Sequence, residues 1–292
     1  MSISRQNLSI VIVTFKSEVV IHECIKSIDK DIKITVIENS NNTLFKDELE
    51  ATYNNVSCFL SSKNLGMGVG NNIGIKKTET DFVLILNPDV ILEQTTINEL
   101  IVASQIIPNF AILAPISSDV NYPNYKLDND KKNIIKNESP FKVKSVDGFA
   151  MLFNKKKLDK IIDEDYFDEN FFMYLENDDL CKRIVDAKEY IYIAPNSKIK
   201  HLGGKAVNIK YKNEVEFARN WHWIWSKFYF NKKHYGYAIA FLEGFPKFFS
   251  NLIKYIFYSL IRNNIKQKIY LNRVSGFFNA AINKRSWYRS QF

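Results

Sequence analysis

Short apolar runs alternate with amphipathic stretches through the first half of the chain. Residues 8–14 (LSIVIVT) form a nearly continuous apolar run of the kind that fills a buried strand, and residues 17–28 then place apolar side chains at helical spacing. This alternation is typical of βαβ units built around a mostly parallel sheet. The pattern predicts further strands at residues 32–37, 56–60, 81–86, 112–114 and 190–194, helices at 69–77, 95–107 and 178–186, and regular structure over 143–153.

Two parts of the chain depart from this pattern. Residues 117–142 are rich in Asn, Asp and Lys, which predicts a long mobile loop. Beyond His201, long aromatic and basic helical stretches replace the strands. We therefore expect a boundary near residue 205, with an α/β domain over residues 1–205 and a helical region over residues 206–292.

The composition of the 292 residues is that of a globular protein. With 46% hydrophobic and 25% charged residues, it argues against a disordered, collagen-like or multi-span membrane chain. The net charge of +8 is unevenly distributed, because residues 205–292 carry 16 Lys and Arg against three acids, a net of +13, which leaves −5 for residues 1–204. All four Trp residues also lie in this last third, so we expect the region to face an anionic surface.

The cysteines and the N-terminus predict a cytoplasmic protein. Cys24, Cys58 and Cys181 are an odd number of widely separated thiols, which indicates a reducing compartment. The N-terminal residues enter a strand pattern directly, without the features of a secretory signal. The most apolar stretch, residues 237–249, contains two charges and a proline, so we expect the chain to lie on a membrane without crossing it.

Polar side chains follow three of the predicted strands. In an open parallel sheet, ligands bind outside the carboxyl ends of the strands, and an acid after the second strand is well suited to a ribose hydroxyl. The pattern therefore predicts a nucleotide site, although each cluster alone also fits a helix cap. The residues are Thr14 and Phe15 after the first strand, Glu38 and Asn39 after the second, and Asn87 and Asp89 after the strand at 81–86.

A segment rich in glycine and asparagine, residues 64–74, lies between the third and fourth strands. Its glycines allow the backbone to approach a ligand closely, and its amides offer hydrogen bonds. It is neither the dinucleotide fingerprint, because it does not follow the first strand, nor a P-loop, because it lacks the Gly-Lys-Ser/Thr sequence. A purely structural turn stays possible. The candidate ligand-binding residues are Asn64, Gly66, Gly70, Asn71 and Asn72.

Asp89 is the natural ligand for a divalent metal. Mg²⁺ or Mn²⁺ prefers carboxylate oxygens and shares its coordination shell with substrate phosphates. His201 is a candidate second ligand because it follows a strand-like stretch at residues 197–200 and precedes a Gly-Gly pair. A plain structural or surface histidine is the alternative.

The densest acidic group, Glu176, Asp178 and Asp179, opens the helix predicted at 178–186. Acids in a first helical turn are favoured by the helix dipole and need no catalytic reason. This group also follows a bulky apolar run, and partial desolvation there would raise the pKa of an acid toward the range of a general base. Both interpretations stay open on the residues alone.

In order along residues 8–205, these segments resemble the family 2 glycosyltransferases of the GT-A fold. The resemblance is closest to the rhamnosyltransferase-like members that build bacterial surface polysaccharides. The tail, with NWHWIWSKFYFNKKHYG and KRSWYR, is also similar to that subgroup. The matching stretches are SIVIVTF, VIENSNN, NLGMGVGNNIGI, LILNPDV, VDGFAMLFNKKKL, FDENFFMYLENDDLCKR and HLGG.

The resemblance implies a GT-A fold, a nucleotide-diphospho-sugar donor, a divalent metal and single-displacement transfer with inversion. By matching position, Thr14, Phe15, Glu38 and Asn39 would line the nucleoside pocket, and residues 64–74 would flank the donor. Asn87-Pro88-Asp89 occupies the place of the family's Asp-x-Asp motif, with His201 as the second metal ligand. Asp147 and Gly148 would lie near the donor sugar and the acceptor.

Two positions depart from the family pattern. Asn87 replaces the first acid of Asp-x-Asp, which puts an amide beside the metal site. Asn177 stands where the family commonly places the second of two acids, which is often the base. We therefore expect Glu176 or Asp178 to be the base, favouring Glu176, with Asp179 orienting the helix or an acceptor hydroxyl.

The basic, Trp-rich tail fits an acceptor attached to a polyprenyl diphosphate carrier at an anionic membrane surface on the inner face of the plasma membrane. The alternative is that its aromatic residues pack against the catalytic domain. One alternative function is nucleic-acid binding by the tail, but it would leave the polar clusters at the strand ends without a purpose. A second is nucleotidyl transfer, but the glycine-rich loop that such enzymes usually have after the first strand is missing after residue 14. We expect no nucleic-acid partner, and dTDP-rhamnose as the donor.

Overall fold

The computed structural model describes residues 3–119, 121–127, 139–163, 165–203, 207 and 209–289. The chain divides into two compact units. The first comprises the residues up to 168 together with 177–208, and the second comprises 169–176 together with 209–292. The expected boundary at residue 205 therefore does not account for residues 169–176, which belong with the C-terminal helices.

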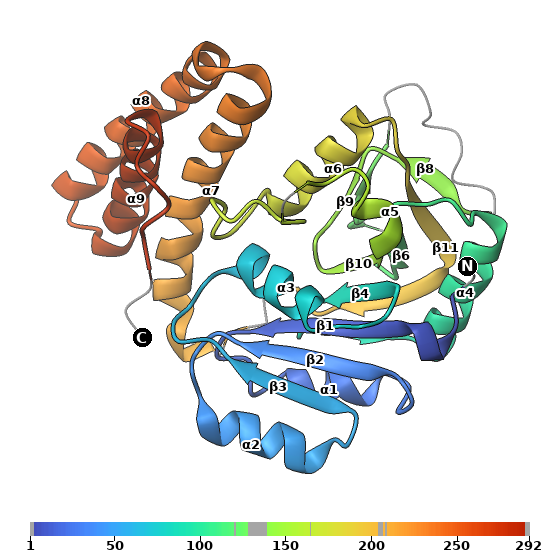
Figure 1. Ribbon diagram of the computed structural model, residues 1–292. Coiled ribbons are helices and arrows are strands. Elements are labelled where there is room, and N and C mark those ends of the chain that lie inside the picture. Colours follow the sequence, from blue (N-terminus) through green and yellow to red (C-terminus); the bar gives the residue numbers. More distant parts are fainter. Residues whose placement is uncertain are drawn as a thin grey trace. The chain divides into compact units, whose positions relative to one another are not determined.

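A mixed nine-stranded sheet forms the centre of the first unit in the part of the chain that the structure describes (Figure 1). Parallel pairing joins β3, β2, β1 and β4 in that order, and also joins β6 with β11. Strands β10, β5 and β8 pair antiparallel with their neighbours. The strands are β1 (Leu8–Thr14), β2 (Lys33–Glu38), β3 (Val56–Leu60), β4 (Phe82–Leu86), β5 (Val90–Leu92), β6 (Ile112–Ser117), β8 (Phe141–Val143), β10 (Ala150–Asn154) and β11 (Ile191–His201); β7 (Tyr125–Lys126) and β9 (Ser145–Val146) form a separate ladder.

Helices cover both faces of this sheet and enclose two hydrophobic cores. Side chains of alternate residues point to opposite faces of a strand, so Ile10 and Ile12 of β1 pack into one core and Val11 into the other. The first core contains α1 (Ile21–Lys26), α2 (Thr43–Thr52) and α4 (Thr96–Ile106), and the second contains α3 (Met67–Lys76), α5 (Lys155–Leu158) and α6 (Glu176–Asp186).

Most predicted elements are present, with three differences. Helix α2 was not predicted, although Asn42 caps it and it buries Phe45 and Leu49. The stretches at 190–194 and 197–200 are one strand, β11, with an irregular register between Ala194 and Lys198. The region at 117–142 is not a loop throughout, since it contains β7 and the start of β8; residues 120 and 128–138 lie outside the described residues.

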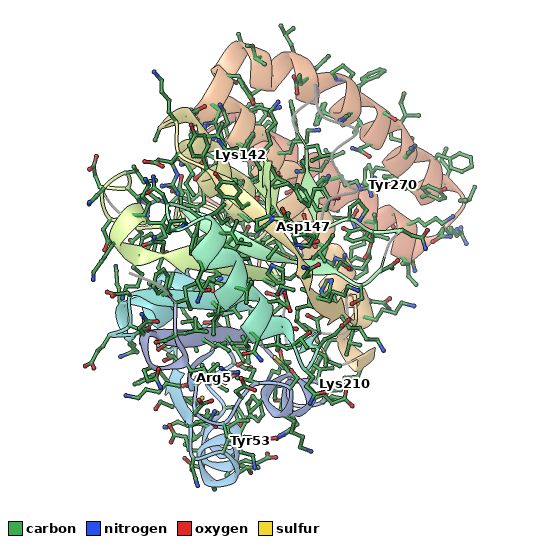
Figure 2. The ribbon with its side chains drawn as sticks, turned by 90° about the vertical axis from the view of Figure 1, so that its right-hand side faces the viewer. Arg5, Tyr53, Lys142, Asp147, Lys210 and Tyr270 are labelled. Atoms are coloured by element: carbon green, nitrogen blue, oxygen red, sulfur yellow. The ribbon has the colours of Figure 1, made fainter. Side chains whose placement is uncertain are left out.

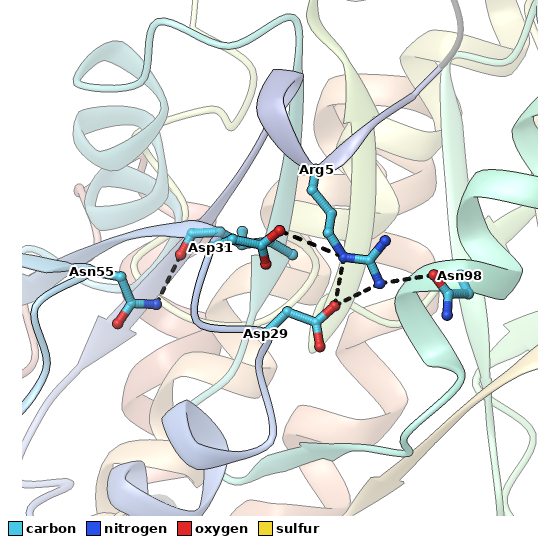
Figure 3. A network of polar contacts seen from close by, with 6 residues as sticks. Arg5, Asp29, Asp31, Asn55 and Asn98 are labelled. Atoms are coloured by element: carbon cyan, nitrogen blue, oxygen red, sulfur yellow. Dashed lines mark hydrogen bonds and ion pairs between the residues drawn. The ribbon is translucent and has the colours of Figure 1, made fainter.

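Arg5 joins three segments at the N-terminal end of β1 (Figure 3). Its guanidinium group lies 2.9 Å from the Asp29 carboxylate and 3.8 Å from that of Asp31, and it donates a hydrogen bond of 2.8 Å to Asn98 of α4. A planar guanidinium with several donors suits such a cluster of acceptors. The network fixes the end of the sheet opposite to the strand ends that carry the candidate site.

The second unit is a bundle of α7 (Lys212–Tyr235), α8 (Tyr237–Leu260) and α9 (Asn264–Ala281), preceded by a short 3₁₀ turn (Ile209–Tyr211). Trp221 and Trp225 are buried in its core with Phe228 and Phe277. Trp221 and Trp225 therefore pack the three helices together and are not among the side chains that could meet the anionic surface expected of this region. Among the described residues, no helix is long and apolar enough to cross a membrane.

Candidate functional site

The carboxyl ends of β1, β2 and β4 meet at one edge of the sheet, because the three strands are parallel and adjacent. Thr14 pairs with Glu38 in the β1–β2 register, and the backbone N–H of Asn39 donates to the Thr14 carbonyl at 2.9 Å. Thr14 is fully buried, and Phe15 follows it at the start of the loop. The structure thus brings the first two predicted clusters together.

The Glu38 carboxylate is occupied by its own loop. One oxygen accepts hydrogen bonds from the backbone N–H and the hydroxyl of Ser40, and the other accepts from the N–H of Asn42 at 2.8 Å. Asn42 in turn caps α2. In this structure Glu38 therefore shapes the turn into α2, which is the capping alternative that its sequence position left open.

Helix α3 begins beside the ends of β1 and β2. Gly66 precedes it with φ of 87°, a left-handed conformation that favours glycine, and its carbonyl accepts from the Asn39 amide at 3.1 Å. A Cβ at Gly70 would lie 2.7 Å from Val13 Cγ1, so only glycine allows the helix to approach β1 this closely. Free backbone N–H groups at such a helix start suit an anionic ligand.

The asparagines of this segment have different roles. Asn64 accepts a hydrogen bond from the Gly66 N–H at 3.1 Å and so shapes the turn. Asn72 makes two hydrogen bonds with the backbone of Phe167, at 2.8 and 3.0 Å, which hold α3 in place. The Asn71 side-chain oxygen is buried and accepts no hydrogen bond from the described residues. Of the three, Asn71 is the one whose acceptor stays open to a ligand.

Asp89 and His201 lie next to each other at the end of β4. The distance from His201 Nε2 to Asp89 Oδ1 is 3.5 Å, and His201 also stacks on Phe149 with ring centroids 4.1 Å apart. The pair is held by β11, because His201 pairs with Val90 and the Leu202 N–H donates to the Asp89 carbonyl. The structure therefore brings together the two residues expected to bind a metal.

A carboxylate and an imidazole side by side are a donor set that suits a divalent cation. The oxygens Asp89 Oδ1 and Asn87 Oδ1 are buried and accept no hydrogen bond from the described residues, an arrangement that is costly unless a ligand or cation satisfies them. The described residues contain no group of three or more His, Cys, Asp or Glu side chains able to hold a metal alone. Few protein ligands are typical of Mg²⁺ sites that complete their shell with substrate phosphates and water.

Asp147 lies in the turn between β9 and β10 of the first unit (Figure 2). Burial raises the pKa of its carboxyl, and the negative charge of Asp178 raises it further, whereas Lys126 and His201 act in the opposite direction. The next residue, Gly148, leaves room for Asn177, whose Cβ would be 3.2 Å from a Cβ at that position. Asp147 is thus an acid whose charge is disfavoured by its surroundings.

We expect Asp147→Asn to raise the melting temperature of the metal-free protein at neutral pH. The pKa of the Asp147 carboxyl is raised in the folded state, so the fold favours the protonated form. The stabilising contribution of this carboxyl to the free energy of unfolding is therefore fully present below the usual carboxyl pKa of about 4, and it is lost as the pH rises through the raised pKa. The difference in melting temperature between variant and wild type, measured in EDTA, should therefore grow from pH 4 toward neutrality. A difference that is independent of pH would contradict this account.

The three acids of the densest group differ in their surroundings. Glu176 is the first residue of α6, directly after Tyr174 and Leu175, which both have positive φ values of 71° and 68°. Asp178 forms an ion pair with Lys126 at 2.6 Å, and the fully buried Asp179 forms one with Arg183 at 2.9 Å. Consecutive left-handed residues without glycine store strain, which is common beside functional groups.

Two neighbours of the site were not predicted. Lys126 reaches Asp178 because β7 pairs with β9, a contact between distant segments that leaves no local signal in the sequence. Phe149, which stacks on His201, directly follows Asp147 and Gly148 and could have been included with them.

Residues 9–162 match the family model for glycosyl transferase family 2. This match covers more than half of the chain. The protein belongs to glycosyl transferase family 2. The resemblance drawn from the seven sequence motifs is thereby confirmed at the level of the family.

Comparison with individual proteins supports the same fold. The chain is 26% identical over 204 residues to the low-salt glycan biosynthesis hexosyltransferase Agl10 of Haloferax volcanii. This match covers 61% of this chain and 61% of Agl10. It is similar to the structure of GalNAc-T7 with UDP, GalNAc and Mn²⁺, with a TM-score of 0.57 and 14% identity over 79% of this chain and 52% of that one. It is also similar to the structure of S. aureus TarS 1-349, with a TM-score of 0.50 and 14% identity over 97% of this chain and 93% of that one. The predicted GT-A fold with a helical C-terminal region is confirmed.

Proposed function

We propose that this glycosyltransferase moves a sugar from a nucleotide-diphospho-sugar to a hydroxyl group of a saccharide acceptor, with inversion at the anomeric carbon. The observation that carries the proposal is the pair of buried, unsatisfied oxygens of Asn87 and Asp89 beside His201, at the edge where β1, β2 and β4 end. Open α/β sheets bind nucleotides at such an edge.

The donor would bind along this edge. The start of α3, with Gly70 and the open acceptor of Asn71, is suited to the nucleotide, and Asp89 with His201 would hold Mg²⁺ or Mn²⁺. A bound cation would supply positive charge against the departing diphosphate. Thr14, Phe15 and Asn39 would lie closest to the nucleoside, while Glu38 would act through the turn that it shapes.

The acceptor hydroxyl requires a base, for which we propose Glu176. Its carboxylate would take the hydroxyl proton while the acceptor oxygen forms the bond to the anomeric carbon and the bond from that carbon to the diphosphate oxygen breaks. Asp178 and Asp179 already pair with Lys126 and Arg183, which compete for the lone pairs that a base would use. These ion pairs argue against Asp178 and Asp179, and the place of Glu176 at the start of α6, after two left-handed residues, supports it as the base. Asp147 and Gly148 would lie near the donor sugar and the acceptor.

For the substrates, we propose rhamnose from dTDP-rhamnose and an acceptor linked to a lipid carrier, in the synthesis of a bacterial surface polysaccharide. This narrower proposal rests on the resemblance of the motifs to the rhamnosyltransferase-like subgroup. Agl10 is named a hexosyltransferase, and the chain spans 61% of its length. A nucleotide donor that carries a hexose other than rhamnose is therefore the alternative to compare first.

A thermal-shift panel of nucleotide sugars with Mn²⁺ or Mg²⁺ tests the proposal. A ligand that binds only the native state raises the melting temperature by mass action. We expect a larger shift with dTDP-rhamnose than with UDP- or GDP-sugars. A shift with another sugar nucleotide would replace the donor and keep the reaction, whereas no shift with any of them, together with tight salt-dependent binding of nucleic acid, would favour a nucleic-acid-binding protein.

A further inference from the structure

Helix α8 belongs to the second unit (Figure 1), and it carries apolar side chains on two opposite faces. One face packs into the bundle through Ala240 and Gly244, where a Cβ on Gly244 would lie 2.5 Å from the Phe277 ring. The opposite face is also apolar but is exposed. A helix that is hydrophobic all round is normally buried on every side, so this second face lacks a partner in the described residues.

We call this exposed face the α8 ridge. Its residues recur at intervals of three and four, which places them on one stripe along a helix of 24 residues, about 36 Å long. Leu242 and Leu260, at its two ends, are 72% and 77% exposed, and Ile253 between them is 53% exposed. The ridge consists of Leu242, Phe245, Phe249, Ile253, Ile256 and Leu260.

The helices of the second unit are strongly basic, since residues 205–292 carry a net charge of +13. Exposed Arg262 and Lys266 follow the C-terminal end of the ridge, whereas Lys247 and Lys254 lie on the packed side of α8, beside Lys227 of α7 and over the Tyr270 ring of α9. Glu243 is the single acid of α8, and it accepts a hydrogen bond of 2.7 Å from Asn231. The sequence contains no acidic residue after Glu243. An apolar stripe on a strongly basic unit, with cations after its C-terminal end, is complementary to a surface with an apolar interior and anionic head groups.

We propose that the α8 ridge inserts into the head-group region of an anionic lipid bilayer, with α8 lying in the plane of the membrane. A protein interface normally surrounds its apolar centre with a polar rim that forms hydrogen bonds, whereas this stripe is long and apolar and belongs to a strongly basic unit. The membrane-facing residues are therefore aliphatic and phenylalanine side chains of α8, and not Trp221 and Trp225, which the bundle core uses.

This inference deepens the proposed function, on which it rests for its purpose, because a lipid-linked acceptor is found at a bilayer surface. Its physical basis is separate from the chemistry of transfer. Vesicle binding and donor binding can therefore be measured independently, and failure of one leaves the other standing.

The test is co-sedimentation with vesicles of phosphatidylcholine and phosphatidylglycerol. The variant carries Leu242→Ser, Ile253→Ser and Leu260→Ser, and its matched control carries Leu44→Ser, Val102→Ser and Ile106→Ser, three exposed aliphatic residues of the first unit. We expect the ridge variant to lose affinity for these vesicles by about tenfold or more, while the control binds like wild type. Circular dichroism and the donor-induced thermal shift should be unchanged in both.

The contribution of charge is tested with vesicles of phosphatidylcholine alone and with the variant Arg262→Glu and Lys266→Glu. Both changes should weaken binding. Equal binding by wild type and the ridge variant would overturn the inference, as would a wild-type protein that does not bind anionic vesicles. A wild-type dimer that the ridge substitutions convert to a monomer, without vesicle binding by either, would instead identify the ridge as a contact between two copies of the chain.

Discussion

Replacing Asp89 by Asn is expected to lower the rate of sugar transfer by about 10³-fold. Its buried Oδ1 faces His201 and accepts no hydrogen bond from the described residues, and we propose that it holds a cation against the departing diphosphate. A metal contributes several kcal/mol to stabilising such a transition state, and each 1.36 kcal/mol is about tenfold in rate. Release of nucleoside diphosphate in the presence of Mn²⁺ measures the effect.

Asp81→Asn is the matched control for this variant. Asp81 immediately precedes β4, at the opposite end of the strand from Asp89, and pairs with Lys156 at the surface. Its substitution should leave transfer close to the wild-type rate. Equal rates for Asp89→Asn and Asp81→Asn would show that Asp89 takes no part in transfer.

Glu176→Gln is expected to lower transfer by about 10²–10⁴-fold, the range typical of a positioned general base. The amide keeps the size of the side chain but takes up no proton. Binding of the donor should be retained, because Glu176 is proposed to act on the acceptor. Single-turnover transfer, together with the donor-induced thermal shift, separates these two effects.

The competing base is Asp178, so Asp178→Asn is measured beside it. Its ion pair with Lys126 predicts a smaller loss of transfer than for Glu176→Gln. If Glu176→Gln keeps nearly wild-type turnover while Asp178→Asn is inactive, the assignment of the base is wrong and the roles of the two acids are exchanged.

The sheet was predictable because its signal is local. The apolar runs at 8–14 and 81–86 correspond to β1 and β4 almost residue for residue, since strands buried on both faces require continuous apolar stretches. Helix α2 was missed because it buries only Phe45 and Leu49 in an otherwise polar segment. The ladder of β7 and β9 depends on pairing between distant segments, and nothing in residues 125–126 alone indicates it.

The candidate site was predictable where its residues follow strands directly in the sequence. Asp89 and His201 were paired from their positions after strands and from the family resemblance, and they lie 3.5 Å apart. The engagement of Glu38 by its own loop was not predictable, because the partners are backbone N–H groups whose directions depend on the turn into α2. The ion pair of Lys126 with Asp178 likewise depends on the fold.

Burial of individual side chains in the C-terminal helices was also not predictable from the sequence. Composition correctly indicated a basic and aromatic region, but it could not distinguish the tryptophans that fill the core from side chains that stay exposed. Trp221 and Trp225 are buried, whereas Leu242 and Leu260 of α8 are exposed. The distinction requires knowing which face of each helix packs against the others.

The central claim is that the edge formed by β1, β2 and β4 binds a nucleotide-diphospho-sugar through a cation at Asp89. Calorimetric titration of the donor nucleoside diphosphate, with and without Mn²⁺, into wild type and Asp89→Asn tests it most directly. The account predicts that Mn²⁺ increases the affinity of wild type by about tenfold or more and has little effect on the variant. Wild-type affinity that does not change with Mn²⁺, or an equal Mn²⁺ effect in both proteins, would contradict it.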